Sequence, residues 1–267
     1  MKKWLMTGLL ALGLLGWAHA DEALRQAIAS PLRTPAFAAR DGWRHPYETL
    51  TFFGLRPDST VVEISPGGGW YTEILAPYLR EKGQLILAAD DPLSTKPETV
   101  KGLERLKAKL ATQPALYDRV KLGVFAPPDK LDYAASASAD LVLTFRNVHN
   151  WMSDGDAGVR AVFASAYRAL KKGGVLGVVE HRLPAAAIQD ATSSSGYVHQ
   201  DYVVQLAQEV GFRLEASSEI NANSKDTADH VGGVWALPPT YANKDVDRDK
   251  YQAIGESDRM TLKFVKP

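Results

Sequence analysis

Glycines, a serine and an acidic residue gather within one short stretch of the chain. Residues 61–72 read Val-Val-Glu-Ile-Ser-Pro-Gly-Gly-Gly-Trp-Tyr-Thr. The apolar start predicts a buried strand, the glycines a tight turn, and the end a helix. In open α/β sheets such a unit binds ligands, because glycine permits close backbone approach and a helix N-terminus offers free N–H groups. We therefore predict a cofactor site built from Glu63, Ser65, Gly67, Gly68 and Gly69.

The spacing of these glycines argues against several other kinds of site. A dinucleotide site needs Gly-x-Gly-x-x-Gly, and in both possible frames the third glycine is replaced, by Trp70 or by Thr72. A P-loop needs Gly-Lys-Ser/Thr, which does not occur. Ser65 is not in the Gly-x-Ser-x-Gly frame of a hydrolase nucleophile. The pattern that remains is acid-x-small-x-Gly-x-Gly, with Glu63 as the acid.

A second group of polar residues follows a later strand. Residues 146–151 read Arg-Asn-Val-His-Asn-Trp and come directly after the strand expected over 139–145. Ligands bind at the carboxyl ends of strands in such sheets, so we expect this run to lie at the site. Histidine exchanges a proton near neutral pH, so His149 is predicted as a general base, with Asn147 and Asn150 orienting its reaction partner. The alternative for His149 is a loop histidine hydrogen-bonded to the backbone.

Several further residues keep two interpretations each. Trp151 is either a packing lid or a cation–π partner. Residues 180–182, Glu-His-Arg, end the next strand and either line the pocket or form a solvated loop. Arg40, Arg44 and His45, before the first strand, either cover the cofactor or only pack the fold.

The composition limits the classes of function. Cysteine is absent, which excludes disulfides, thiol nucleophiles and thiolate metal sites and suits an oxidising compartment. The net charge is 0 at pH 7, so no nucleic-acid surface is indicated. No zinc spacing such as His-Glu-x-x-His occurs, and we predict no metal. The spacing of His45, His181, His199 and His230 matches no such pattern.

The N-terminus has the pattern of an export signal. Within residues 1–20, two lysines precede the mostly apolar run 4–17, and 18–20 read Ala-His-Ala, a small-x-small cleavage site. The run is too short to span a bilayer comfortably, which takes about 20 residues. We predict a cleaved leader, a mature start at Asp21, and a periplasmic or secreted protein without stable membrane association. An uncleaved N-terminal anchor is the alternative.

The order of the elements predicts one α/β domain. Strands alternate with helices, which indicates a doubly wound, parallel, Rossmann-like sheet. We expect an N-terminal helical segment over 21–58, the main domain over 59–267, and within it a long irregular insertion without a clear helix over 221–258. Strands are expected over 60–64, 84–89, 120–125, 139–145, 175–180, 213–220 and 260–265, and helices over 22–29, 70–79, 99–111, 157–170 and 199–210.

Three motifs carry a resemblance to a known family. The stretches 63–71, 144–151 and 258–264 are similar to the class I S-adenosylmethionine-dependent methyltransferases, closest to a group of predicted exported bacterial methyltransferases. The resemblance covers about residues 37–267, and Ser65 stands where the family usually has its first glycine. It implies a seven-stranded, mostly parallel sheet with an antiparallel C-terminal strand, and S-adenosyl-L-methionine as the cofactor.

The resemblance also implies roles for single residues. Glu63 would organise the amino group of the donor, and the turn glycines would pass close to its amino acid and ribose. Either Asp90 or Asp91, at the end of the second strand, would bind the ribose hydroxyls. The family often has an acid after the third strand that contacts the adenine, but this chain has Phe125 there, which could stack on the ring instead. Arg146 is predicted among the cofactor contacts.

The resulting hypothesis is an exported methyltransferase that acts on a small-molecule acceptor by direct in-line displacement, with no nucleic-acid partner. The alternative is a non-catalytic exported protein that binds a small ligand on the same fold, because fold alone does not set function. Export conflicts with a donor that is made in the cytosol. No motif indicates the acceptor or the oligomeric state.

Overall fold

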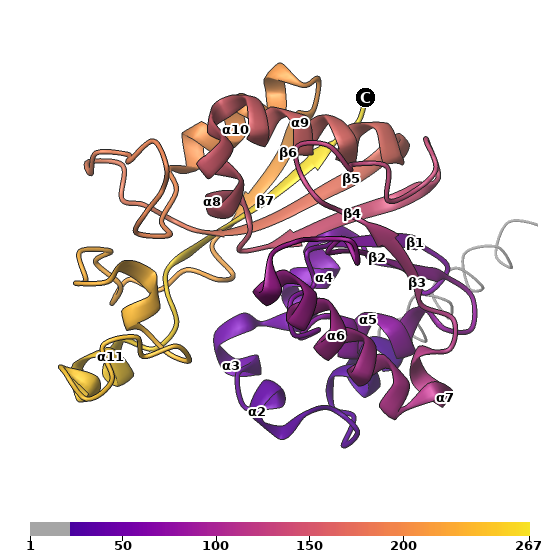
Figure 1. Ribbon diagram of the computed structural model, residues 1–267, viewed down its shortest axis with the longest axis horizontal. Helices are drawn as coiled ribbons and strands as arrows, with labels where there is room; N and C mark the ends of the chain where they lie inside the picture. Colours follow the sequence, from indigo (N-terminus) through magenta and orange to yellow (C-terminus); the bar gives the residue numbers. More distant parts are fainter. Residues whose placement is uncertain (1–21) are drawn as a thin grey trace, which may run out of the picture.

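A seven-stranded sheet forms the centre of the protein (Figure 1). The computed structural model describes residues 22–267, and the predicted leader lies outside the described residues. The strands are β1 (Thr60–Ile64), β2 (Gln84–Ala89), β3 (Lys121–Val124), β4 (Ala139–Phe145), β5 (Leu170–His181), β6 (Arg213–Ser218) and β7 (Arg259–Val265). Their order is β3-β2-β1-β4-β5-β7-β6. β1 to β5 pair in parallel, and β7 runs antiparallel to both β5 and β6. The predicted mostly parallel sheet with an antiparallel C-terminal strand is confirmed.

Helices cover both faces of this sheet (Figure 1). One layer contains α9 and α10, and the other contains α4, α5 and α6. The helices are α2 (Pro35–Ala38), α3 (Asp41–Arg44), α4 (Pro46–Phe53), α5 (Thr72–Leu79), α6 (Pro97–Thr112), α7 (Pro114–Tyr117), α8 (Val148–Trp151), α9 (Gly155–Ala169), α10 (Gln200–Glu209) and α11 (Arg248–Ile254), and residues 22–28 are also helical. Short 3-10 turns span Met152–Asp154 and Gly233–Ala236.

The side-chain alternation of the strands explains the two layers. Successive residues of a strand point to opposite faces. Val62 and Val142 therefore pack in the core under α9 and α10, while Val61 and Leu141 pack in the core under α4 and α5. Because both faces are covered, the central strands carry continuous apolar runs, as parallel strands buried on both faces do.

Two of the expected boundaries differ in ways that concern the turn and the sheet. Helix α5 begins at Thr72 and not at Trp70, because residues 67–71 belong to the turn. Strand β5 begins at Leu170, which pairs with Ala139, and not at residue 175 as expected. Pairing with neighbouring strands decides this start, and a local pattern in the sequence cannot report it.

The insertion over 221–258 is also more regular than expected. It contains α11 and the 3-10 turn Gly233–Ala236. Tyr251 and Ile254, three residues apart on α11, bury their side chains against Ala236 and Leu237. The expectation of no helix was wrong because this short helix depends on contacts within the insertion.

Asp226 fastens the insertion to the main body. Its buried carboxylate accepts hydrogen bonds from the hydroxyl of Tyr197 at 3.0 Å and from Nε2 of His230 at 2.8 Å. It also accepts from the backbone N–H groups of Ala228 at 3.0 Å and Asp258 at 2.8 Å. One carboxylate therefore joins the loop before α10 to both ends of the insertion.

The helices in residues 22–267 include none with both the length and the apolar composition that a membrane crossing requires.

We expect Asp226→Ala to lower the free energy of unfolding by about 3 to 5 kcal/mol, because it removes one partner of a buried pair and leaves several donors unpaired. Urea denaturation followed by circular dichroism measures this change. Asp245→Ala, at an exposed position of the same insertion, is the control and should change stability by less than about 0.5 kcal/mol. Equal stability of the two variants would contradict the role given to Asp226.

Candidate functional site

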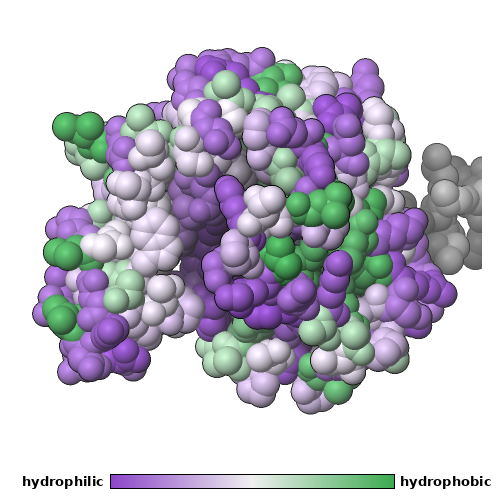
Figure 2. All heavy atoms as spheres, in the orientation of Figure 1, coloured by the Kyte–Doolittle hydropathy of each residue, from purple (hydrophilic) through white to green (hydrophobic). Residues whose placement is uncertain are grey.

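The carboxyl ends of β1, β2, β4 and β5 meet at one edge of the sheet, since these strands are parallel neighbours. Two adjoining cavities open there, one of about 550 Å³ and one of about 260 Å³. Both are lined by Asn147 and by residues 65–68 of the turn. Figure 2 shows a hollow coloured as hydrophilic beside the insertion that carries α11. The structure thus brings the turn together with Arg146 and Asn147, the first two residues of the run after β4.

The turn after β1 needs residues in the left-handed backbone region. Gly67 and Gly69 have φ values of 56° and 80°. Ser65 also lies in this region, at φ 50°, where a side chain costs about 1 to 2 kcal/mol. A glycine at position 65 would avoid that cost. Residues 65–68 line both cavities.

Glu63 lies beneath this turn. Its side chain is buried and lines the smaller cavity, and Thr72 Oγ1 donates a hydrogen bond to Glu63 Oε2 at 2.7 Å. Burial raises the pKa of Glu63 to about 8, against the smaller opposite effect of the Thr72 hydrogen bond. At neutral pH the carboxyl is therefore mostly protonated, and a cationic ligand in the cavity would favour its ionised form.

The two acids that follow β2 have different surroundings. Asp90 lines this cavity, and partial burial raises its pKa. Asp91 instead pairs with Lys130 Nζ at 2.5 Å, a hydrogen bond that lowers its pKa. The structure therefore places Asp90 on the cavity wall and gives Asp91 a different partner.

The opposite wall of the larger cavity comes from α6. Gly102, Leu103, Leu106 and Lys109 lie there. The sequence predicts a helix over 99–111 but did not indicate that it lines a cavity. The glycine at 102, one helical turn from the buried Leu106, is the signal that could have indicated a close approach.

Two predicted aromatic residues lie away from the cavities. Phe125 is buried in the core and packs edge-on against Tyr133 and Trp151, and it lines neither cavity beside the turn. Trp151 is buried too and also packs against Phe163. The structure gives both rings a packing role, so the stacking contact expected for Phe125 finds no support in its position.

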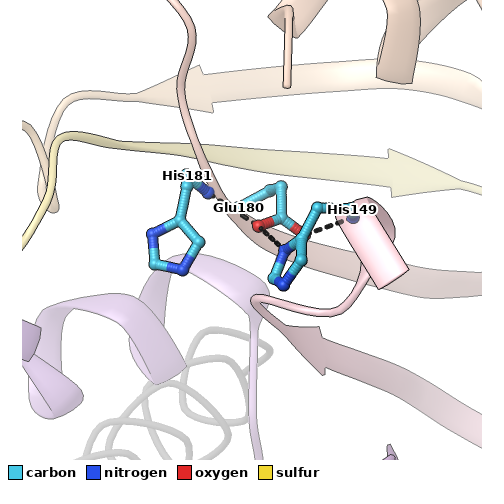
Figure 3. Close-up of side chains that lie close together, drawn as sticks. All are labelled: His149, Glu180 and His181. Carbon is cyan, nitrogen blue, oxygen red and sulfur yellow. Dashed lines mark hydrogen bonds and ion pairs between the residues drawn. The ribbon is translucent and has the colours of Figure 1, made fainter. Parts of the chain in front are cut away.

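His149 lines neither of the two cavities and lies beside Glu180 and His181 (Figure 3). His149 comes from α8, and the other two residues come from the end of β5. His149 Nδ1 lies 3.0 Å from Glu180 Oε1, and the N–H of His181 donates to the same oxygen at 2.8 Å. Glu180 Oε2 accepts from the N–H of Val148 at 2.5 Å and of His149 at 3.4 Å.

This arrangement fixes the tautomer of His149. Glu180 has four N–H donors around its two oxygens, so we assign the hydrogen of His149 to Nδ1 and the lone pair to Nε2. A histidine held in this way by a carboxylate is a competent general base. The sequence placed Glu180 only among pocket or loop residues, because its contact with α8 is tertiary.

The same three side chains could be considered as metal ligands, since their donor atoms lie within 4.8 Å of one another. Both oxygens of Glu180 already accept hydrogen bonds, three of them from backbone N–H groups that cannot turn away. We therefore assign Glu180 to orienting His149.

His181 and the insertion complete this end of the site. Burial, followed by the nearby His149 and several arginines, lowers the pKa of His181 well below its usual value, so its imidazole is neutral. Ser257 Oγ lies 2.5 Å from its Nδ1. Trp235, from the insertion, meets the His149 ring edge-on at 6.0 Å between ring centroids. The sequence gave no interpretable motif in this insertion, so Trp235 was missed.

Some of the remaining candidate residues line the cavities beside the turn and others do not. Arg40 and Arg44 line the smaller cavity together with Arg146. His45 connects α3 to α4 and lines neither of the two cavities. Arg182 pairs with Glu219 and Asp258 and lines a separate pocket. Asn150 is exposed, and its predicted role in orienting the acceptor stays a prediction.

Comparisons with known proteins support the fold. No family model and no curated protein matches the chain. An S-adenosylmethionine-dependent methyltransferase from Aquifex aeolicus is 14% identical, covers 92% of this chain and 98% of its own, and has a TM-score of 0.56. The cyclase SpnF is 14% identical, with 95% of each chain covered and a TM-score of 0.58. At these identities the likeness shows the fold alone, which is the class I methyltransferase fold.

We expect nitrogen NMR of histidine-labelled protein to show His149 with its hydrogen on Nδ1. Glu180→Gln should convert this single tautomer into a mixture, because an amide can both donate to and accept from Nδ1. Glu215→Gln, at an exposed position of β6, should leave the His149 signals unchanged. A tautomer with its hydrogen on Nε2 in the unaltered protein would contradict the assignment of Nε2 as the base.

Proposed function

We propose that the protein is an exported S-adenosylmethionine-dependent methyltransferase that acts on a small-molecule acceptor. The single observation that carries the proposal is the placement of Glu63 and Asp90 on adjoining cavities at the left-handed turn. The methyltransferase structures that share this fold support it. The fold specifies neither export nor the class of acceptor, and both are part of this proposal.

The two cavities match the parts of the methyl donor. Glu63 would pair with the ammonium of its amino acid in the smaller cavity, next to the backbone of the turn. Asp90 would accept hydrogen bonds from the ribose hydroxyls, and the wall formed by α6 would contact the adenine in the larger cavity. When bound, the donor supplies an electrophilic methyl group on a sulfonium. Asn147 lines both cavities and thus lies between these parts.

The chain's own residues would act by positioning and by taking a proton. Nε2 of His149, held by Glu180, would accept the proton of a hydroxyl or amine acceptor. Asn147 Nδ2 donates to the carbonyl oxygen of Ile64 at 3.1 Å, which fixes the loop after β4 against the turn. Holding acceptor and methyl about 3 to 3.5 Å apart would supply most of the rate enhancement. Trp235 would help to exclude water above His149.

A non-catalytic binding protein is the second candidate, and two observations favour it. Phe125 is buried in the core, and residues 125–128, which directly follow β3, include no acid that could contact the adenine. The cyclase SpnF has the same fold, so the fold itself does not require methyl transfer. Tight binding of the donor, without transfer of its labelled methyl group to any small molecule of a cell extract, would favour this candidate.

We expect calorimetry to show binding of S-adenosylhomocysteine that weakens as the pH falls from 8 to 6, by up to about tenfold per pH unit. The reason is the pKa of Glu63, about 8 in the free protein, since pairing with the ligand's ammonium requires the ionised carboxylate. Glu63→Gln should bind more weakly and lose this pH dependence. Glu104→Gln, at an exposed position of α6, should retain both. Absence of any binding to the folded protein would overturn the methyltransferase proposal.

Export has its own test. Expression of the full chain, followed by cell fractionation and N-terminal sequencing, should give a protein that starts at Asp21 in the periplasm or the medium. Replacing the small residues Ala18 and Ala20 by bulky ones should block this processing. A chain that starts at Met1 and remains in the cytosol would contradict export while leaving the enzymatic proposal in place.

A further inference from the structure

Arginines outnumber carboxylates beside the smaller cavity. Arg40, Arg44, Arg146 and Arg259 form what we call the arginine cluster. Glu256 pairs with three of them, at 2.6 Å from Arg40, 3.1 Å from Arg44 and 3.2 Å from Arg259. Among residues 22–267, Glu256 is the one carboxylate paired with this cluster. Four guanidinium groups thus share a single negative charge.

Arg44 has an unused hydrogen-bond donor. Its side chain is only 2% exposed, yet its Nη2 has no hydrogen-bond partner. Arg44 lines the smaller cavity, with its guanidinium carbon 4.7 Å from the centre of the Trp70 ring. Burial, together with Arg146, lowers the pKa of Arg44 to about 8. Buried charged groups without partners are rare because they are costly, so this end of the cavity favours an anionic ligand.

The guanidinium of Arg146 has fewer hydrogen-bond and ion-pair partners than that of Arg44. Its side chain lines the same cavity, and within residues 22–267 its guanidinium forms no hydrogen bond or ion pair. The residue follows β4 directly and precedes His149 by three positions, with a backbone φ of 62°. Arg146 is therefore the member of the cluster whose guanidinium is free to bind a ligand in the smaller cavity.

The cluster reaches beyond the part of the site expected to hold the donor. Arg259 lies opposite His181 in the pairing of β7 with β5, and the charges of Arg146, Arg259 and Arg44 contribute to the lowered pKa of His181. The cluster therefore extends from the turn to the histidine end of the site. The donor's ammonium is assigned to Glu63, so its carboxylate and Glu256 are the two negative charges that remain beside the four guanidinium groups.

We propose that the methyl acceptor is a small molecule that carries an oxyanion, a carboxylate or a phosphate, and that Arg146 binds this group. The proposal rests on the proposed function. A guanidinium binds both kinds of oxyanion through two parallel N–H···O bonds, which would orient the acceptor as well as attract it. With its anion on Arg146, the reactive hydroxyl or amine of the acceptor would lie against Nε2 of His149. Arg146 would then contact the acceptor, and not the donor as the sequence predicts.

The test uses protein saturated with S-adenosylhomocysteine, so that the donor's own carboxylate is in place. Calorimetry then measures the binding of inorganic phosphate and of benzoate, with neutral benzamide as the control ligand. We expect at least one of the two anions to bind and benzamide not to bind. Arg146→Gln should weaken anion binding about ten- to a hundredfold and change the affinity for S-adenosylhomocysteine by less than about threefold. Arg146→Lys should retain part of the anion binding, because it keeps the charge but not the paired donors.

Arg213→Gln is the matched control, since it removes the same charge from an exposed position at the start of β6. Failure of both anions to bind to the saturated protein would overturn the inference and leave the methyltransferase proposal standing. Arg146→Gln that weakens only S-adenosylhomocysteine would do the same and would return Arg146 to the donor site. If S-adenosylhomocysteine itself does not bind, both the proposed function and this inference fall. Whichever anion binds identifies the acidic group of the acceptor.

Discussion

The parallel pairing of β1, β2, β4 and β5 is the constraint on which the site depends. Hydrogen bonds between parallel neighbours bring the carboxyl ends of these strands to one edge of the sheet. Glu63, Asp90, Arg146 and Glu180 stand at those ends or directly after them, although more than a hundred positions separate the first from the last. Helices on both faces cover the rest of the sheet, so this edge is where polar groups can meet a ligand.

Two buried carboxylates of the site, Glu180 and Glu63, differ in how many hydrogen bonds they accept within the protein. Glu180 is fully buried and accepts from four N–H groups, so its acceptor capacity is used within the protein. Glu63 is nearly as buried but accepts from the Thr72 hydroxyl alone among the hydrogen bonds found in residues 22–267, and burial raises its pKa. The first can fix His149 in one orientation, whereas the second is mostly protonated at neutral pH and a bound cation would favour its ionised form.

The cations of the site follow the same logic. Arg182 pairs with Glu219 and Asp258 and thereby joins β5 to the insertion, as a structural residue does. Arg146 has no such partner, and Arg44 satisfies only part of its guanidinium through Glu256. The protein thus keeps unpaired positive charge at one end of its site, beside the neutral His181. That imbalance is stable only because solvent or a ligand can reach the cavity.

The sequence by itself determined the sheet, the turn and most of the strands. The strands expected over 60–64, 84–89 and 139–145 match β1, β2 and β4, because apolar runs bounded by glycine, proline and polar residues are local signals. The glycine turn could also be recognised from the sequence, since left-handed backbone favours glycine wherever it occurs. These features depend on short stretches of chain, and so a single sequence carries them.

Only the tertiary structure decided which groups meet. It placed Asp90 on a cavity wall and Asp91 beside Lys130, paired Glu180 with His149, and brought Trp235 of the insertion onto that histidine. It also formed α11, which packs against other residues of the insertion, and placed Phe125 in the core. Burial and charge balance arise from residues far apart in the chain, and no local pattern encodes how such residues are brought into contact.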